Sequence, residues 1–127
     1  MRKVYIPQKI QVSPLYNVQS SSASGIVLKT GKAFLSIESL NIEAIQTVSD
    51  GDGGYIVDWS LRFGMVSNNP VSHFLYNTPI LAQFTDSDGT LVCLGSLKHP
   101  LIMKTASRNT NEHRLEFYTQ CKLSDNQ

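Results

Sequence analysis

The chain has 127 residues, enough for one domain, with 41% hydrophobic residues and 11 basic against 10 acidic residues, a formal net charge of +1. This composition excludes a membrane-spanning chain, a disordered chain and a strongly basic nucleic-acid-binding protein. Pro7, Gln8 and Lys9 interrupt the first apolar residues, so the sequence predicts no signal peptide. Cys93 and Cys121 lie in strand-like patterns, and we expect reduced, buried thiols; a disulfide between them is the alternative.

The first residues predict a strand followed by a flexible segment. Residues 3–12 have the composition of a strand, and the Ser-rich stretch Ser20–Gly25 is typical of a flexible connection. We therefore divide the chain into an N-terminal strand with a flexible Ser-rich arm, residues 1–25, and a β-domain over residues 26–127.

Residues 33–48 fit either a helical stripe or two short strands. Isoleucine and valine are plentiful here and a hairpin partner follows, which favours two strands with a kink near Ser39. The Gly-rich segment Ser49–Gly54 then predicts a mobile hairpin tip. A strand with one apolar face follows it, and its apolar positions are Tyr55, Val57, Trp59, Leu61 and Phe63.

The second half of the chain predicts one short helix and three more strands. Asn69 and Pro70 are typical of a helix start and predict a helix over residues 70–76. The turn Asp86–Gly89 separates two apolar runs and predicts a β-hairpin over residues 79–96. Alternation predicts a last strand over residues 114–122, preceded by an adaptable loop over 105–112.

These elements predict an all-β fold: a single-domain β-sandwich or partly open β-barrel with one short helix. The strand residues with large apolar side chains form the expected core. The predicted core residues are Leu35, Ile37, Tyr55, Val57, Trp59, Leu61, Phe63, Leu81, Phe84, Val92, Leu94, Leu115 and Phe117.

The near-zero net charge hides three blocks of opposite sign. Residues 1–37 carry five basic residues and no acidic one, residues 38–90 carry seven acidic residues against Arg62, and residues 91–127 carry five basic and three acidic residues. One interpretation is that neighbouring blocks pair on a single solvated surface. The other is that the basic N-terminal segment of one subunit docks on the acidic hairpins of the next, which would build a ring.

Motifs for metal or covalent chemistry fail on their spacing. Asp50 opens a calcium-loop-like run, but Leu61 stands where the twelfth-position glutamate is needed. The histidines, His73, His99 and His113, lack zinc-ligand spacing, and no nucleophile elbow or phosphate-binding loop is present. We expect no enzyme and no cofactor.

The order of elements resembles one family. The resemblance spans residues 25–122 and is carried by the segments Gly25–Leu28, Phe34–Ile37, Gly54–Leu61, Asp88–Val92, Gly95–Leu101 and Arg114–Phe117. In these segments the chain is similar to small β-rich proteins from the head-and-tail gene clusters of tailed phages and prophages of Bacteroidetes, crAss-like phages included. The resemblance implies a virion structural subunit at the neck or tail that works by oligomeric assembly.

We therefore expect a non-enzymatic virion subunit in a ring-like head–tail connector, neck or tail assembly, made in the host cytoplasm. Its partners would be copies of itself and other virion proteins, with neither membrane nor nucleic acid as a partner. The predicted assembly-interface residues are Arg2, Lys3, Lys9, Asp50, Asp52, Asp86, Asp88 and Arg108. The alternative is a β-sandwich recognition module that binds a carbohydrate or peptide through exposed aromatic residues such as Tyr5, Tyr16 and Tyr76.

Overall fold

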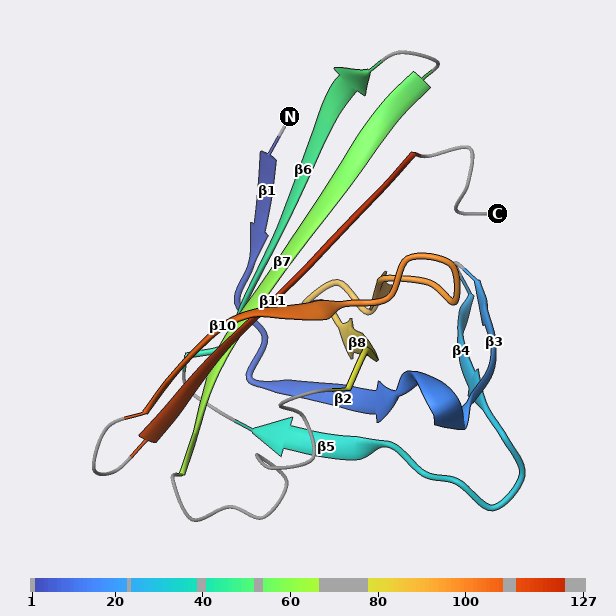
Figure 1. The fold of residues 1–127 in the computed structure, drawn as a ribbon, viewed down its shortest axis with the longest axis vertical. Coiled ribbons are helices and arrows are strands. Elements are labelled where there is room, and N and C mark those ends of the chain that lie inside the picture. The colour runs from blue at the N-terminus through green and yellow to red at the C-terminus, as the bar shows by residue number, and fades with distance from the viewer. Residues whose placement is uncertain are drawn as a thin grey trace.

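The fold is built almost entirely of strands. The structure, a computed structural model, describes residues 2–22, 24–38, 41–51, 54–66, 78–108 and 112–122, without the side chains of residues 51, 65, 66, 105–108, 112, 113, 121 and 122. Two antiparallel sheets pack face to face, and a two-stranded sheet lies to one side (Figure 1). The predicted single-domain β-sandwich is confirmed; the predicted helix over 70–76 lies outside the described residues.

The larger sheet, sheet A, has the strand order β1-β6-β7-β11-β10, and every pair of neighbours is antiparallel. Its strands are β1 (Arg2–Tyr5), β6 (Glu43–Gly51), β7 (Gly54–Val66), β10 (Ile102–Arg108) and β11 (Glu112–Lys122). Of the two strands with the clearest alternation in the sequence, β7 is the central strand and β11 lies next to it. The register places Trp59 of β7 opposite Thr119 of β11 and Gln46 of β6.

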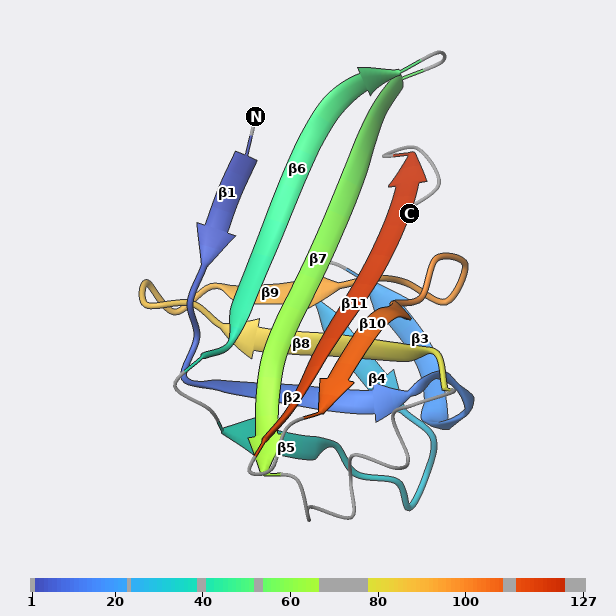
Figure 2. The same ribbon diagram turned by 60° about the vertical axis from the view of Figure 1, so that its left-hand side comes forward.

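The smaller sheet, sheet B, has the order β5-β2-β8-β9. Its strands are β2 (Lys9–Pro14), β5 (Leu35–Glu38), β8 (Ile80–Thr85) and β9 (Leu91–Leu94), and the chain leaves β2 through a 3-10 turn, η1 (Leu15–Asn17). The hairpin of β3 (Val18–Ser22) and β4 (Gly25–Leu28) packs beside it, with Val18 and Ile26 against Leu81 of β8. The strands of sheets A and B cross at a steep angle (Figure 2), as in orthogonally packed sandwiches.

The core lies between the two sheets because each strand of sheet A turns every second side chain toward sheet B. Val57, Trp59, Leu61 and Phe63 of β7 are buried there, and the Phe63 ring stacks on Phe117 of β11 with centroids 5.8 Å apart. The other predicted core residues that the structure buries are Ile37, Leu81, Phe84, Leu94 and Leu115. Leu35 and Val92 are half-buried, and Tyr55 is exposed.

Two of the passages of the chain between sheets A and B fall where the sequence shows a break. The prediction of one strand over residues 3–12 is wrong: β1 belongs to sheet A and β2 to sheet B, and Pro7 between them has no N–H to continue a ladder. The two strands predicted over residues 33–48 are confirmed as β5 and β6. The break between them also carries the chain from sheet B to sheet A.

Most of segment 1–25, in which we expected a strand and a flexible arm, is built into the three sheets. β2 lies between β5 and β8 in sheet B, with Ile10 and Val12 fully buried. The Ser-rich part pairs with β4 as β3. The Ile26 N–H of β4 donates to Gln83 Oε1 at 3.2 Å and ties this hairpin to sheet B. Buried apolar contacts and a hydrogen bond thus order a segment that is flexible by composition.

Both predicted hairpins are confirmed. Between β8 and β9, the Gly89 N–H donates to the Asp86 carbonyl at 2.9 Å, and Gly89 has a φ of +88°, which a residue without a side chain adopts easily. Between β6 and β7, the ladder continues as far as the pair Gly51 and Gly54. The predicted tip Ser49–Gly54 is therefore mostly strand, and its residues 52 and 53 lie outside the described residues.

The predicted loop over residues 105–112 is wrong at both ends. Residues 105–108 belong to β10, and residue 112 begins β11. Only Thr105 in this segment has a clear preference for strands, and pairing with β11, from Thr105–Glu116 to Arg108–His113, holds the segment in the sheet. Tertiary pairing thus overrides local propensity here.

Candidate functional site

A groove at the N-terminal corner gathers several of the predicted interface residues. It has a volume of about 840 Å³ and lies where the chain passes from β1 to β2, beside the end of β8. Its charged lining residues are Lys3, Lys9 and Asp86, and its polar ones include Gln11 and Gln83. Val4 and Ile6 add exposed apolar side chains.

Lys3 sits on an aromatic cluster that joins the two sheets. Its Nζ lies 4.9 Å from the centroid of the Tyr5 ring, within the range of a cation–π contact. Tyr5 packs against Trp59 of sheet A and against Phe84 of sheet B, with ring centroids 6.1 and 5.3 Å away. The Tyr5 side chain, by hydrogen bonding, raises the pKa of Lys3, and the carboxylates of Asp86 and Asp88 raise it further. Lys3 therefore stays protonated.

The acidic turn between β8 and β9 lies close to this lysine. Asp88 Oδ1 accepts a hydrogen bond from the Thr90 N–H at 3.0 Å. That bond is the main reason why the pKa of Asp88 lies below its usual value, and the charge of Lys3 lowers the pKa further. At this turn, the basic N-terminal segment and an acidic hairpin therefore meet within one chain, as in the first interpretation of the charge blocks.

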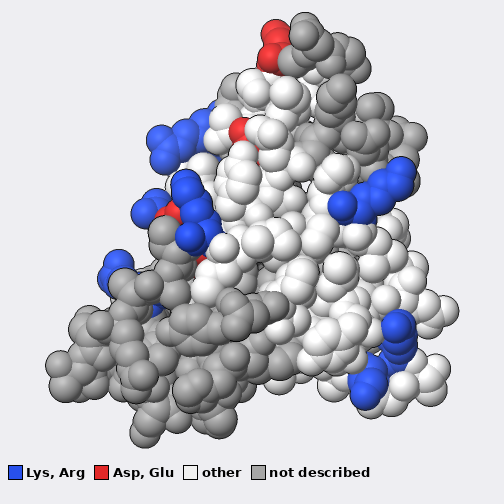
Figure 3. Space-filling view, viewed as in Figure 1, with Lys and Arg blue, Asp and Glu red and all other residues white. Residues whose placement is uncertain are grey.

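The other predicted interface residues are more dispersed. Arg2 is exposed on β1 opposite Thr47, which is three residues before Asp50 on β6. Asp50 is exposed near the end of the long β6–β7 hairpin; Asp52 lies outside the described residues. Arg108 ends β10, but its side chain is not among those described. Acidic side chains appear at the top of the view and also among the basic groups on the left, and basic side chains lie in separate groups along both sides (Figure 3).

The β6–β7 hairpin extends beyond the layer that covers it. The strands of sheet B are four to six residues long and β7 has 13 residues, so the upper part of β6 and β7 projects past β9 (Figure 2). Tyr55 occupies a core-facing position in the alternation of β7, yet it is 55% exposed. The prediction of Tyr55 as a core residue is wrong because alternation reveals which face a residue is on but not whether a second layer covers it.

The root of this projection forms a second hollow. It has a volume of about 260 Å³ and is bounded by sheet A on one side and by β9 and the β3 strand on the other. Its aromatic walls are Tyr5 and Trp59, and Gln46 and Cys93 also line it. Only part of each side chain is accessible there, since Trp59 is buried and Cys93 half-buried.

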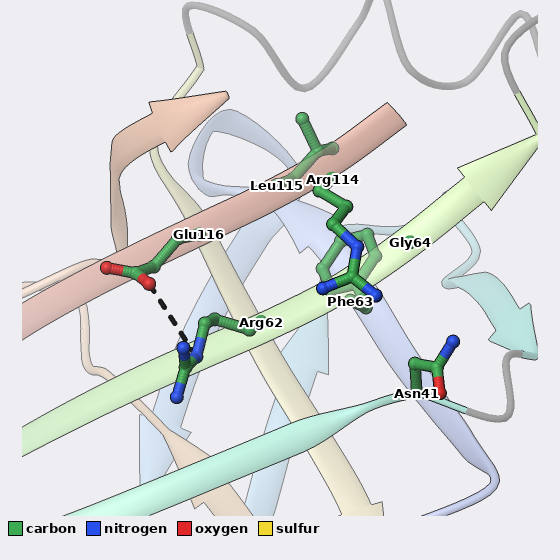
Figure 4. A pocket seen from close by; sticks show the side chains of 7 residues that line it. All are labelled: Asn41, Arg62, Phe63, Gly64, Arg114, Leu115 and Glu116. Carbon is green, nitrogen blue, oxygen red and sulfur yellow. Dashed lines mark ion pairs between the residues drawn. The ribbon is translucent and has the colours of Figure 1, made fainter. Parts of the chain in front are cut away.

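The outer face of sheet A, which points away from sheet B, carries a ladder of ion pairs. Arg62 of β7 pairs with Glu43 of β6 and with Glu116 of β11, and Glu116 also pairs with Lys104 of β10 at 3.7 Å. A hollow of about 210 Å³ lies next to this ladder. Figure 4 shows Arg62 and Glu116 on one side of it and Arg114 with Asn41 on the other. These exposed pairs fix the side chains rather than adding much stability.

Among the described side chains, Cys93 is one of the residues that the sequence offered for metal or covalent chemistry. Cys93 is a free, half-buried thiol, and burial raises its pKa; a reactive cysteine needs the opposite shift. Among the described residues, no group of three His, Cys, Asp or Glu side chains could hold a metal ion. His73 lies outside these residues and the His113 side chain is not described.

The described part of the chain contains no helix long and apolar enough to cross a lipid bilayer. Comparisons with protein-family models, with curated proteins and with solved structures gave no match for this chain.

Proposed function

We propose that the chain is a non-enzymatic structural subunit of a phage particle, which assembles with copies of itself into a ring-like head–tail connector, neck or tail assembly. The phage context rests on the resemblance in the order of elements between residues 25 and 122. The role in assembly rests on the shape and surface of the sandwich.

The observation that carries the proposal is the projecting β6–β7 hairpin. A soluble monomer normally covers the apolar face of a strand with its own second layer. Here the alternation of β7 runs past the end of sheet B and leaves Tyr55 exposed. A neighbouring subunit can supply the missing cover.

Charge would set the register between subunits. Lys9 lies exposed at the N-terminal corner, Arg2 lies exposed at the start of β1, and Asp50 lies exposed near the end of the hairpin. A head-to-tail contact between hairpin and corner joins surfaces of opposite charge, and contacts of this type close into a ring where the rotation permits. Because the charges are exposed, salt should weaken the contact.

The test compares two double charge reversals that change the net charge equally. We expect Arg2→Glu with Lys9→Glu to convert the oligomer into monomer at physiological salt. Lys29→Glu with Lys32→Glu is the control, since both lysines are exposed and lie in a turn between β4 and β5. Lys3 stays unchanged because it contacts Tyr5. Native mass by light scattering is the readout, and equal masses for the two variants would contradict the proposed contact.

A second candidate function is recognition of a carbohydrate or peptide. The groove at the N-terminal corner favours it, because 840 Å³ is within the usual size range of ligand pockets and Tyr5 and Gln11 are suited to stacking and hydrogen bonding. A recognition module would remain monomeric at every salt concentration and melt at a higher temperature with its ligand.

A further inference from the structure

The outer face of sheet A carries a row that crosses the whole sheet and is apolar or aromatic at every position except the central Ser60. The strand registers align one residue from each of the five strands, and the row is Val4, Ile45, Ser60, Tyr118 and Ile102. These residues are far apart in the sequence. Directly opposed residues of neighbouring strands lie about 5 Å apart, so their side chains form one continuous stripe.

All five side chains point away from the core. Ser60 lies between the buried Trp59 and Leu61, and Tyr118 between the buried Phe117 and Thr119, so both face outward. Within the described ranges, sheet B and the β3–β4 hairpin lie on the other side of sheet A (Figure 1). The two ends and one inner member of the row are well exposed: Val4 is 46%, Ile102 is 51% and Tyr118 is 37% accessible.

The rows on either side of the stripe carry opposite charges at the central strand. Arg62 lies two residues after Ser60 on β7, on one side of the stripe. Its side chain is 52% exposed despite its ion pairs with Glu43 and Glu116. Asp58 lies two residues before Ser60, on the other side of the stripe. It accepts a hydrogen bond from the Tyr118 hydroxyl at 3.2 Å. Arg62, within its ion pairs with Glu43 and Glu116, and Asp58 therefore lie on opposite sides of Ser60.

We propose that a second copy of this chain stacks its own outer face on this stripe, with a two-fold axis running along the row. This rotation leaves each row residue opposite its own counterpart and exchanges the two flanking rows. Arg62 of each copy then faces Asp58 of the partner subunit, which gives two opposite-charge pairs. The rotation also reverses the strand direction, so the two sheets can pack in the aligned manner of a sandwich.

The face is large enough for such a contact. Five strands spaced about 4.8 Å apart and three outward rows about 6.8 Å apart give roughly 480 Å² per copy. The two copies together would bury about 1,000 Å², the lower limit for a specific interface. The face includes Val4, which also lines the N-terminal groove, and Arg2, which shares the row of Asp58, but it includes neither Lys9 nor the hairpin tip.

The test compares two variants that carry one cysteine each, the first on the proposed axis and the second away from it. In both variants Cys93 and Cys121 are replaced by alanine. Stacked sheets are about 10 Å apart, so the thiols of two Ser60→Cys chains would lie about 6 Å from each other. Gln120→Cys is the matched control, since Gln120 is exposed on the same face but two rows from its counterpart, about 15 Å away. The probe is a short bismaleimide cross-linker that can join the two Ser60→Cys thiols but is too short to join the two Gln120→Cys thiols.

We expect most Ser60→Cys chains to be cross-linked as dimers and few Gln120→Cys chains. Adding Asp58→Arg to Ser60→Cys places like charges opposite each other and should slow cross-linking at least tenfold, with little effect on the melting temperature. Equal yields at the two positions, or no dimer from Ser60→Cys, would overturn the proposed stacking. The ring proposal fails separately, if the wild-type chain forms this dimer and nothing larger.

Discussion

Replacing Phe117 with alanine is expected to lower the free energy of unfolding by about 3–5 kcal/mol, the usual loss for a buried phenylalanine. Phe117 is fully buried at the centre of sheet A and stacks on Phe63. The substitution removes this stacking and leaves a cavity that the rigid sheet cannot close. Urea unfolding followed by the fluorescence of Trp59 measures the loss, at a protein concentration low enough to keep the chain monomeric.

The neighbouring residue is a sharp control for the register. Tyr118 follows Phe117 on the same strand but faces outward. Tyr118→Ala should therefore lower the free energy of unfolding by less than about 1 kcal/mol. A shift of one residue in the pairing of β11 would exchange the two faces. If Tyr118→Ala cost as much as Phe117→Ala, the register described for β11 would be wrong.

A chain that begins at Gly25 is expected not to fold. This deletion removes β2 from the middle of sheet B together with its buried Ile10 and Val12. The neighbouring strands β5 and β8 would then face each other across the gap of a missing strand. Circular dichroism and the dispersion of amide proton signals by NMR measure the outcome.

A shorter deletion separates loss of the fold from a general effect of truncation. A chain that begins at Ile6 lacks only the edge strand β1, so it should keep a cooperative unfolding transition at reduced stability. A folded chain from Gly25 would contradict the structure and would make residues 1–25 the separable arm that their composition predicted.

Local pattern predicted the strands well where one face of a strand meets the core. The alternation in β7 and β11 and the turn Asp86–Gly89 are encoded by residues close together in the sequence, and all three are confirmed. The assignment of strands to sheets is a different matter, because it depends on contacts between distant segments. For this reason the sequence predicted a break between β5 and β6, but it did not predict that the chain passes there from sheet B to sheet A.

The surface was less predictable than the core for the same reason. The sequence reveals blocks of charge, but only the fold brings Lys3 close to Asp86 and Asp88. The mostly apolar row on sheet A combines residues from five strands, and none of them stands out in its own segment. The exposure of Tyr55 likewise depends on how far sheet B extends.

The most direct test of the central claim is the native mass of the wild-type chain at several salt concentrations, by light scattering after size-exclusion chromatography. Assembly through exposed charges predicts a discrete oligomer of several subunits at low salt that dissociates as salt rises. A monomer at every salt and protein concentration would contradict a chain that assembles with copies of itself.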